Sequence, residues 1–222
     1  MASRVDVSWI FPILMGVVVV AAIVSAIVGG RRKRRNLQAL AQRLGLDYVM
    51  DDGPKFSFTL DVATSERDAT RKVCVEGTIR GRRVEFSEFT TSAGRSSQRW
   101  TEVAVAAVAG DFEFSLQQEG LGWKLMRWLG DEEVTIGDRE FDAQWHIKAS
   151  SPDTLQAMLL PELRGKITAA GLSGTQGHFM LFDGWMRYIE RGGFEDPSRV
   201  ARGERVLGLL SDLAVAAEVA AK

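Results

Sequence analysis

The chain has 222 residues, of which 45% are hydrophobic and 26% are charged. This composition excludes an intrinsically disordered chain and a collagen-like one. The charges are unevenly placed, because the first 35 residues contain six Lys and Arg and one acid, whereas the remainder contains 22 Lys and Arg and 28 Asp and Glu. A basic start therefore precedes an acidic body that is long enough for one ordinary domain.

The first predicted element is a transmembrane helix at residues 9–30, which follows a short extracytoplasmic tail at residues 1–8. Residues 9–28 carry no charge, and twelve of these twenty are Ile, Leu, Phe or Val. A helix of this length is about 30 Å long, which matches the hydrocarbon core of a bilayer. A cleaved signal peptide is the alternative, but its apolar run has about 7 to 15 residues and follows its positive charges. The residues expected inside the membrane include Trp9, Phe11, Ile13, Val20, Ile23 and Val28.

A basic collar of five residues follows the span. Lys and Arg beside a span stay on the cytoplasmic side, so we expect a single pass through the cell (inner) membrane with the C-terminal domain in the cytoplasm. Each base near an anionic leaflet adds about 1 kcal/mol of attraction, so we also expect the collar to contact the membrane surface. The alternative is that the collar is only a topology signal. Its members are Arg31, Arg32, Lys33, Arg34 and Arg35.

Residues 31–45 combine this collar with a juxtamembrane helix. Leu37, Leu40 and Leu44 recur at helical spacing, and Gly45 supplies a stop. No Gly-, Ser- or Pro-rich linker separates this helix from the span, so the domain is expected to lie close to the membrane.

Residues 46–222 are predicted to form a single α+β domain. Alternation of apolar and polar residues predicts strands at 56–62, 73–80, 83–90, 100–108 and 112–116, and the short connections favour an antiparallel meander. The run 103–109 is apolar at every position, which is typical of a strand covered on both faces.

The second half of the domain mixes strands and helices. Phe141, Ala143, Trp145 and Ile147 are predicted on one face of a strand. Cap signatures at Ser151-Pro152 and Asp196-Pro197 predict two helix starts, and Pro161 must kink or divide the first helix before Gly171 ends it. A hairpin is expected around Asp183-Gly184. The predicted fold class is α+β, an N-terminal transmembrane helix followed by a largely antiparallel sheet packed with helices.

Several short segments occur in a characteristic order along the chain: Leu44–Leu46, Gly77–Arg82, Gly122–Leu125 and Ile136–Asp142. With the span and the basic collar, this order resembles an uncharacterised family of prokaryotic single-pass membrane-anchored proteins. The Gly-Asp-x-Glu-Phe-Asp motif at residues 137–142 is the most specific part. The resemblance covers most of the chain and implies an anchored architecture, but it implies no activity and no catalytic residue.

The densest group of acids lies at residues 131–142, and we predict a solvated face there. Its spacing is that of a calcium loop only in part, because such a loop needs Gly at its sixth and Glu at its twelfth position, where this chain has Ala143 and Ala149. No metal site and no cofactor are predicted, since Cys74 is the single cysteine and the two histidines lie 32 residues apart. His146 shares the predicted polar face with Asp142, which leaves an enzyme site as an alternative.

Two segments are candidates for intermolecular contact. Residues 120–129 interleave bulky apolar residues with bases, which is typical of a segment that lies on a membrane surface. The alternative is a short helix that covers the sheet with both tryptophans in the core. The residues expected at the membrane surface are Trp123, Lys124, Arg127 and Trp128. Inside the span, small residues at helical spacing favour helix association: Ala22, Ser25, Ala26 and Gly29.

These patterns predict a single-pass membrane-anchored protein that acts by binding, as an accessory subunit or scaffold of a membrane complex. The expected partners are the lipid bilayer and a membrane protein or a second copy bound through the span. Nucleic acid is not expected, because the body is acidic. The alternatives are a small-ligand sensor and a membrane-anchored enzyme. First suspects for an enzyme site are Asp138, Glu140, Asp142 and His146.

Overall fold

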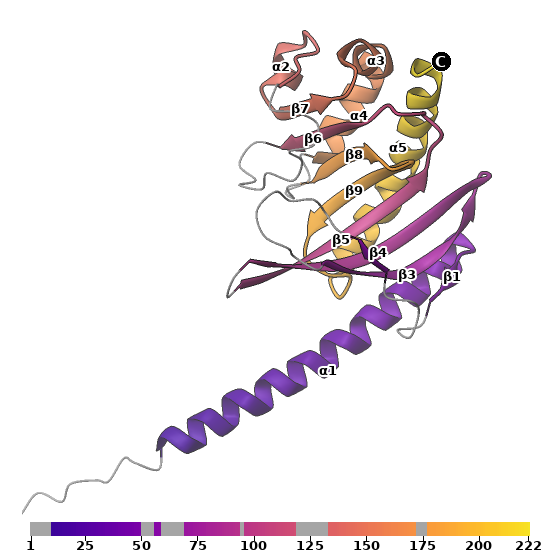
Figure 1. Ribbon diagram of the computed structural model, residues 1–222. Helices are drawn as coiled ribbons and strands as arrows, with labels where there is room; N and C mark the ends of the chain where they lie inside the picture. Colours follow the sequence, from indigo (N-terminus) through magenta and orange to yellow (C-terminus); the bar gives the residue numbers. More distant parts are fainter. Residues whose placement is uncertain (1–9, 50–55, 59–68, 94–95, 119–132, 172–176) are drawn as a thin grey trace, which may run out of the picture.

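The computed structural model describes residues 10–49, 56–58, 69–93, 96–118, 133–171 and 177–222 (Figure 1). Its most conspicuous element is α1 (Ile10–Leu44), an unbroken helix of 35 residues that projects from the domain. This helix is long and apolar enough to cross a membrane. It ends where Gly45 adopts φ +65°, a conformation that glycine reaches without a steric penalty. The apolar segment and the predicted juxtamembrane helix thus form one continuous helix.

The two parts of α1 have different surroundings. Val17, Val20 and Ile23 are 63%, 60% and 54% exposed, whereas Leu37 and Leu40 are completely buried in the main core. The last three turns of the helix therefore belong to the domain.

The domain is built on one sheet, whose strand order in the described residues is β1-β3-β4-β5-β9-β8-β6-β7, with β2 paired to β3. Every one of these pairings is antiparallel, as predicted. The strands are β1 (Asp47–Tyr48), β2 (Phe56–Phe58), β3 (Ala69–Ile79), β4 (Arg82–Ala93), β5 (Ser96–Ala106), β6 (Phe114–Gln118), β7 (Trp145–Ala149), β8 (His178–Phe182) and β9 (Trp185–Arg191).

The connections between these strands are only partly those of a meander. β3, β4 and β5 form the predicted meander, but β5 then pairs with β9 rather than with β6. The β8–β9 hairpin turns at Asp183 and Gly184, as expected, and separates β5 from β6 in the sheet. β5 is thus central, and Val103, Ala104 and Val105 are buried as predicted. The predicted strand is too long at its end, because β5 stops at Ala106 and Val108 is 83% exposed.

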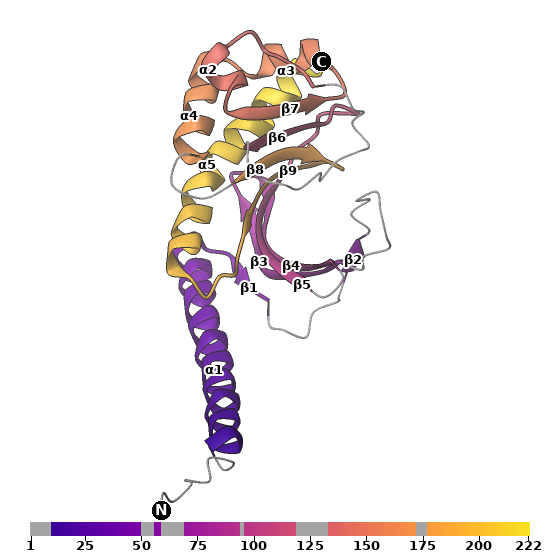
Figure 2. The same cartoon turned by 90° about the vertical axis from the view of Figure 1, so that its left-hand side faces the viewer.

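Within the described ranges, four helices complete the domain: α2 (Arg139–Asp142), α3 (Pro152–Met158), α4 (Pro161–Gly171) and α5 (Pro197–Ala220). In Figure 2, α4, α5 and the end of α1 lie on one side of the sheet, and β3, β4 and β5 curve away from them. Gly203 lets α5 approach closely, because a Cβ there would lie 3.1 Å from Val103 and 3.2 Å from Phe86. The main core lies between α5 and this face of the sheet.

The helix signals in the second half behave as predicted. The side chains of Ser151 and Asp196 accept hydrogen bonds from backbone amides in the first turns of α3 and α5, and Pro161 separates α3 from α4. The strand expected over Phe141–Ile147 is wrong in its first half. There the Asp138 side chain accepts hydrogen bonds from two backbone amides and caps α2, so β7 begins only at Trp145.

The burial of α1 in the core predicts that Leu40→Ala lowers the free energy of unfolding by about 2 to 5 kcal/mol, because it leaves a cavity between α1 and the domain. Urea denaturation of the detergent-solubilised chain, followed by near-UV circular dichroism, measures this. The control is Gln42→Ala on the exposed face of the same turn, expected to change stability by less than about 0.5 kcal/mol. Equal effects of the two substitutions would contradict the docking of α1.

Candidate functional site

The first candidate site is the junction at which α1 enters the domain. Asn36 donates hydrogen bonds from its amide nitrogen to the carbonyl oxygens of Phe194 (3.0 Å) and Glu195 (3.3 Å). Glu88 on β4 accepts from Lys33 through one carboxylate oxygen (2.6 Å) and from the backbone amide of Phe194 through the other (2.7 Å). Glu88 is only 8% exposed, so these contacts are shielded from water. They fix α1 to a loop that is 158 residues away in sequence.

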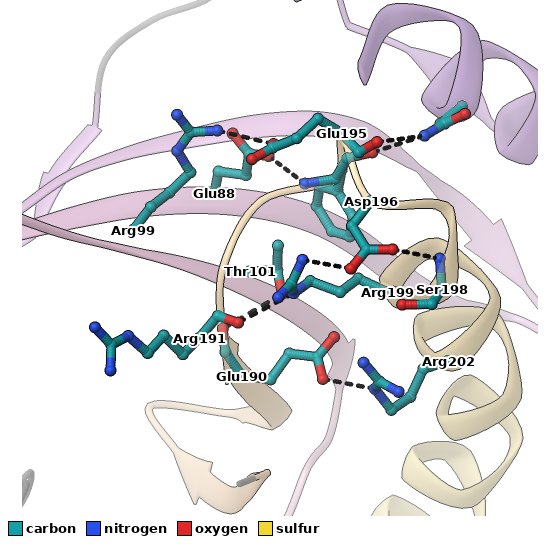
Figure 3. A network of polar contacts seen from close by, with 12 residues as sticks. Glu88, Arg99, Thr101, Glu190, Arg191, Glu195, Asp196, Ser198, Arg199 and Arg202 are labelled. Atoms are coloured by element: carbon teal, nitrogen blue, oxygen red, sulfur yellow. Dashed lines mark hydrogen bonds and ion pairs between the residues drawn. The ribbon is translucent and has the colours of Figure 1, made fainter. Parts of the chain in front are cut away.

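The loop that receives α1 is also held from its other side (Figure 3). Asp196 caps α5 through the amide of Ser198 (2.9 Å) and pairs with Arg199 (2.7 Å). Arg199 donates in turn to the carbonyl oxygen of Arg191 at the end of β9 (3.0 Å). These hydrogen bonds and ion pairs hold the loop on both sides, so the junction between the loop and α1 has little freedom to bend.

The basic collar is divided between the domain and its surroundings. Lys33 is half-buried and pairs with Glu88, whereas the four arginines, Arg31, Arg32, Arg34 and Arg35, are exposed. Lys33 therefore has a partner inside the protein that the sequence did not indicate. Contact of the collar with a membrane surface remains a prediction.

The second candidate site is a buried charged cluster on the face of the sheet opposite α5. Strand alternation places Val103 of β5 toward α5 and its neighbour Glu102 on the other face. Glu102 is 0% exposed and accepts two hydrogen bonds from Arg71 (3.1 and 3.2 Å) and one from Arg187 (2.9 Å). Arg71 also pairs with Glu85 at 2.8 Å. Arg83, whose side chain is 60% exposed, pairs with Glu85 as well at 2.9 Å, so two acids and three bases meet in this cluster.

The electrostatics of this cluster follow from the pairing. Burial by itself raises the pKa of Glu102, but the nearby Arg187 and Arg71 outweigh it, and the pKa is lowered from the ordinary value. Burial likewise lowers the pKa of Arg71, while Glu102 and Glu85 raise it by more. Both groups are consequently charged at neutral pH, and the charge of each is stabilised by the other.

A histidine lies two strands away on the same face. His178 is 3% exposed, and its Nε2 lies 3.4 Å from Oγ of Ser115. Among the described residues, Nδ1 of His178 and Nε of Arg187 are buried without a hydrogen-bond partner. Burial lowers the pKa of His178 to about 4, so its imidazole is neutral at pH 7.

This pair of side chains does not form a nucleophilic site of the usual kind. A serine nucleophile needs a base whose second nitrogen is oriented by a third group. Nδ1 of His178 has no such partner in the described part of the chain, and a pKa of about 4 makes the imidazole a weak base. The contact between Ser115 and His178 therefore contributes to the packing of this face of the sheet and pairs two of its buried polar atoms.

Two acids of the Gly-Asp-x-Glu-Phe-Asp motif bind backbone amides of the loop in which they lie. Asp138 caps α2 and pairs with Arg164 of α4 at 2.8 Å. The carboxylate of Asp142 accepts hydrogen bonds from the successive backbone amides of residues 136–137, each 3.1 Å long. These carboxylates are engaged with the backbone and with α4, which gives the motif a structural role.

The other two residues predicted for an enzyme site, Glu140 and His146, lie near the surface. Glu140 is exposed, and His146 pairs with Glu133 at 3.0 Å near the surface. The four side chains do not share a contact. Within the residues that the structure describes, no group of three or more His, Cys, Asp and Glu side chains is placed to hold a metal ion.

The predicted membrane residues lie on α1 as far as they are described. Val20, Ile23 and Val28 are exposed, as are Ala22, Ser25 and Ala26 of the predicted association stripe, while Gly29 is half-buried. Phe11 and Ile13 lie in the first turn of α1. The remaining expected contact residues lie outside the described residues: Trp9, Trp123, Lys124, Arg127 and Trp128.

The burial of His178 predicts a pH-dependent stability. Its folded pKa is about 4 and its ordinary value 6.5, so between these pH values the unfolded chain binds more protons. Stability is therefore lost as the pH falls from 6.5 to 4, by about 3 kcal/mol in all. His178→Gln should flatten this part of the profile of the urea midpoint against pH. Gln42→Ala is the control, since this exposed side chain does not titrate, and it should retain the wild-type profile. A wild-type slope in His178→Gln would be contrary evidence.

Comparison of the chain with protein-family models, with curated proteins and with solved structures finds no match. The resemblance to prokaryotic membrane-anchored proteins, carried by the motif at residues 137–142, accordingly remains a prediction.

Proposed function

We propose that this protein is a single-pass membrane protein whose α+β domain acts by binding at the cytoplasmic surface, as an accessory subunit or scaffold of a membrane complex. The observation that carries the proposal is the continuity of α1. One helix presents exposed apolar side chains over its first part and buries Leu37 and Leu40 in the domain core over its last turns. In water the exposed part would be unfavourable, whereas in lipid it is the expected surface.

This geometry holds the domain in one orientation. A flexible linker would let the domain search for partners, but here the helix runs from its apolar part into the domain, and the contacts of Asn36 and Glu88 hold its last turns. A binding protein that serves one membrane complex benefits from such pre-orientation, because less rotational freedom is lost on association. Rigid attachment therefore supports a subunit or scaffold over a roaming enzyme.

The cytoplasmic side is proposed from the collar. Four exposed arginines follow the apolar part of α1, and the positive-inside rule retains such residues in the cytoplasm. Asp138 and Asp142 bind the backbone of their own loop and His146 pairs with Glu133, which gives the enzyme alternative no support from these residues.

The topology can be tested with single cysteines. Cys74 is 3% exposed and would be protected on either side of the membrane, so it is replaced by alanine. In that background, Val108→Cys, at a position 83% exposed in the folded domain, should resist a membrane-impermeant maleimide in intact cells and react after lysis. Ser3→Cys in the predicted outer tail should react in intact cells. The reverse labelling pattern would place the domain outside.

The role of rigid attachment can be tested by inserting Gly-Ser-Gly-Ser between Arg35 and Asn36. The insertion should leave the chain in the membrane after an alkaline wash but abolish the copurification of partner proteins in mild detergent, because the domain loses its fixed orientation. The control carries the same insertion in the tail before Trp9 and should copurify the wild-type set. A wild-type chain that purifies alone as a monomer would refute the subunit proposal.

A further inference from the structure

Residues of α4 and α5 line a groove. The two helices lie on the helical side of the sheet (Figure 2). Its volume is about 410 Å³, within the range of about 300 to 1,000 Å³ that is usual for small-molecule sites. Ala169 of α4 and Val206 and Leu209 of α5 supply apolar lining. The groove is therefore large enough and apolar enough to shield a small apolar group from water.

The polar lining of the groove is predominantly basic. Lys166 and Asp212 pair with each other at 3.1 Å and cancel in charge. Arg205 is exposed and has no hydrogen bond or ion pair with any described residue. The groove thus keeps one positive charge that no acid of its own lining neutralises.

Arg202 gives the groove a built polar group. It is 7% exposed, and Glu190 of β9 holds its Nε at 2.6 Å. Figure 3 shows this single contact, and the two terminal nitrogens of the guanidinium make no hydrogen bond within the described part of the chain. Arg202 is one of the residues that line the groove, and a guanidinium is the group that proteins commonly use to bind carboxylates and phosphates.

Arg202 and Arg205 are three residues apart on α5 and hence lie on one face of the helix. Two arginines at this spacing can donate to the same anionic group. The apolar lining lies alongside them, since Val206 and Leu209 follow on the same helix. The expected ligand consequently has one anionic end and an apolar body.

We propose that the groove between α4 and α5 is a binding site for a small amphiphilic anion, an apolar chain or ring that ends in a carboxylate or phosphate. The Nη atoms of Arg202 and the guanidinium of Arg205 bind the anionic group, and the apolar body lies along Val206 and Leu209. Such a group can come from a free amphiphile or from an anionic lipid. The site does not depend on the proposed role of the anchor, because it is contained in the domain.

The test is isothermal titration of octyl phosphate and octanoate into the full chain in phosphatidylcholine nanodiscs, with empty nanodiscs subtracted. Both anions should bind saturably, and octanol should bind at least about tenfold more weakly, which corresponds to about 1.4 kcal/mol. Arg205→Gln and Arg202→Lys should each weaken the anions about tenfold. The lysine variant retains a cation for Glu190 and so keeps the fold. Arg80→Gln, on the exposed β3–β4 turn, is the matched loss of one charge and should bind as wild type.

Equal affinity for octanol and the anions, or unchanged binding by both arginine variants with intact near-UV circular dichroism, would overturn the proposal. Binding of the anions no greater than that of empty nanodiscs would do so as well. Nanodiscs that contain phosphatidic acid identify the source of the ligand. Competition with octyl phosphate supports a bilayer lipid, and undiminished binding supports a free amphiphile.

Discussion

One helix has to satisfy two environments, and the arrangement of the whole molecule depends on how it does so. Val20 and Ile23 leave apolar side chains on the surface of α1, while Leu37 and Leu40, a few turns later, are completely buried among domain residues. The two parts belong to one continuous helix, so the direction of the apolar part relative to the domain is set by the helix itself. Asn36 extends the constraint, because the loop whose carbonyl groups it binds leads directly into α5.

Burial also constrains where the charged side chains of the domain can lie. Taking an ion out of water costs several kcal/mol unless it is paired with good geometry, so the buried Glu102 depends on Arg187 from the adjacent β9 and on Arg71, which reaches it from β3 across β4. Glu88 follows the same logic on the opposite face, where Lys33 and the amide of Phe194 both contact its carboxylate. Each face of the sheet therefore has a polar group that specifies one arrangement, in addition to the apolar core.

Most of the architecture could be predicted from local signals. The cap residues Ser151 and Asp196, the break at Pro161 and the glycine stop at Gly45 all act through a few neighbouring residues, and the structure confirms each of them. The wrong prediction of a strand at residues 141–144 also has a local cause. The apolar residues at alternate positions fitted a strand, but the side chain of Asp138 binds the next amides and starts a helical turn, a competition that periodicity alone does not resolve.

The candidate site could not be predicted in the same way, because its contacts join residues that are far apart in sequence. Arg71 is 31 residues from Glu102, and Arg187 is 85 residues from it, across a strand order in which β9 follows β5. On one strand, an alternating Glu or Arg looks the same whether it faces water or an opposite charge. What distinguishes the two cases is whether the neighbouring strands supply opposite charges at the matching register. A search for alternating strands with complementary charges would have singled out Glu85, Glu102 and Arg187, and the insertion of the β8–β9 hairpin beside β5 decides that these residues meet.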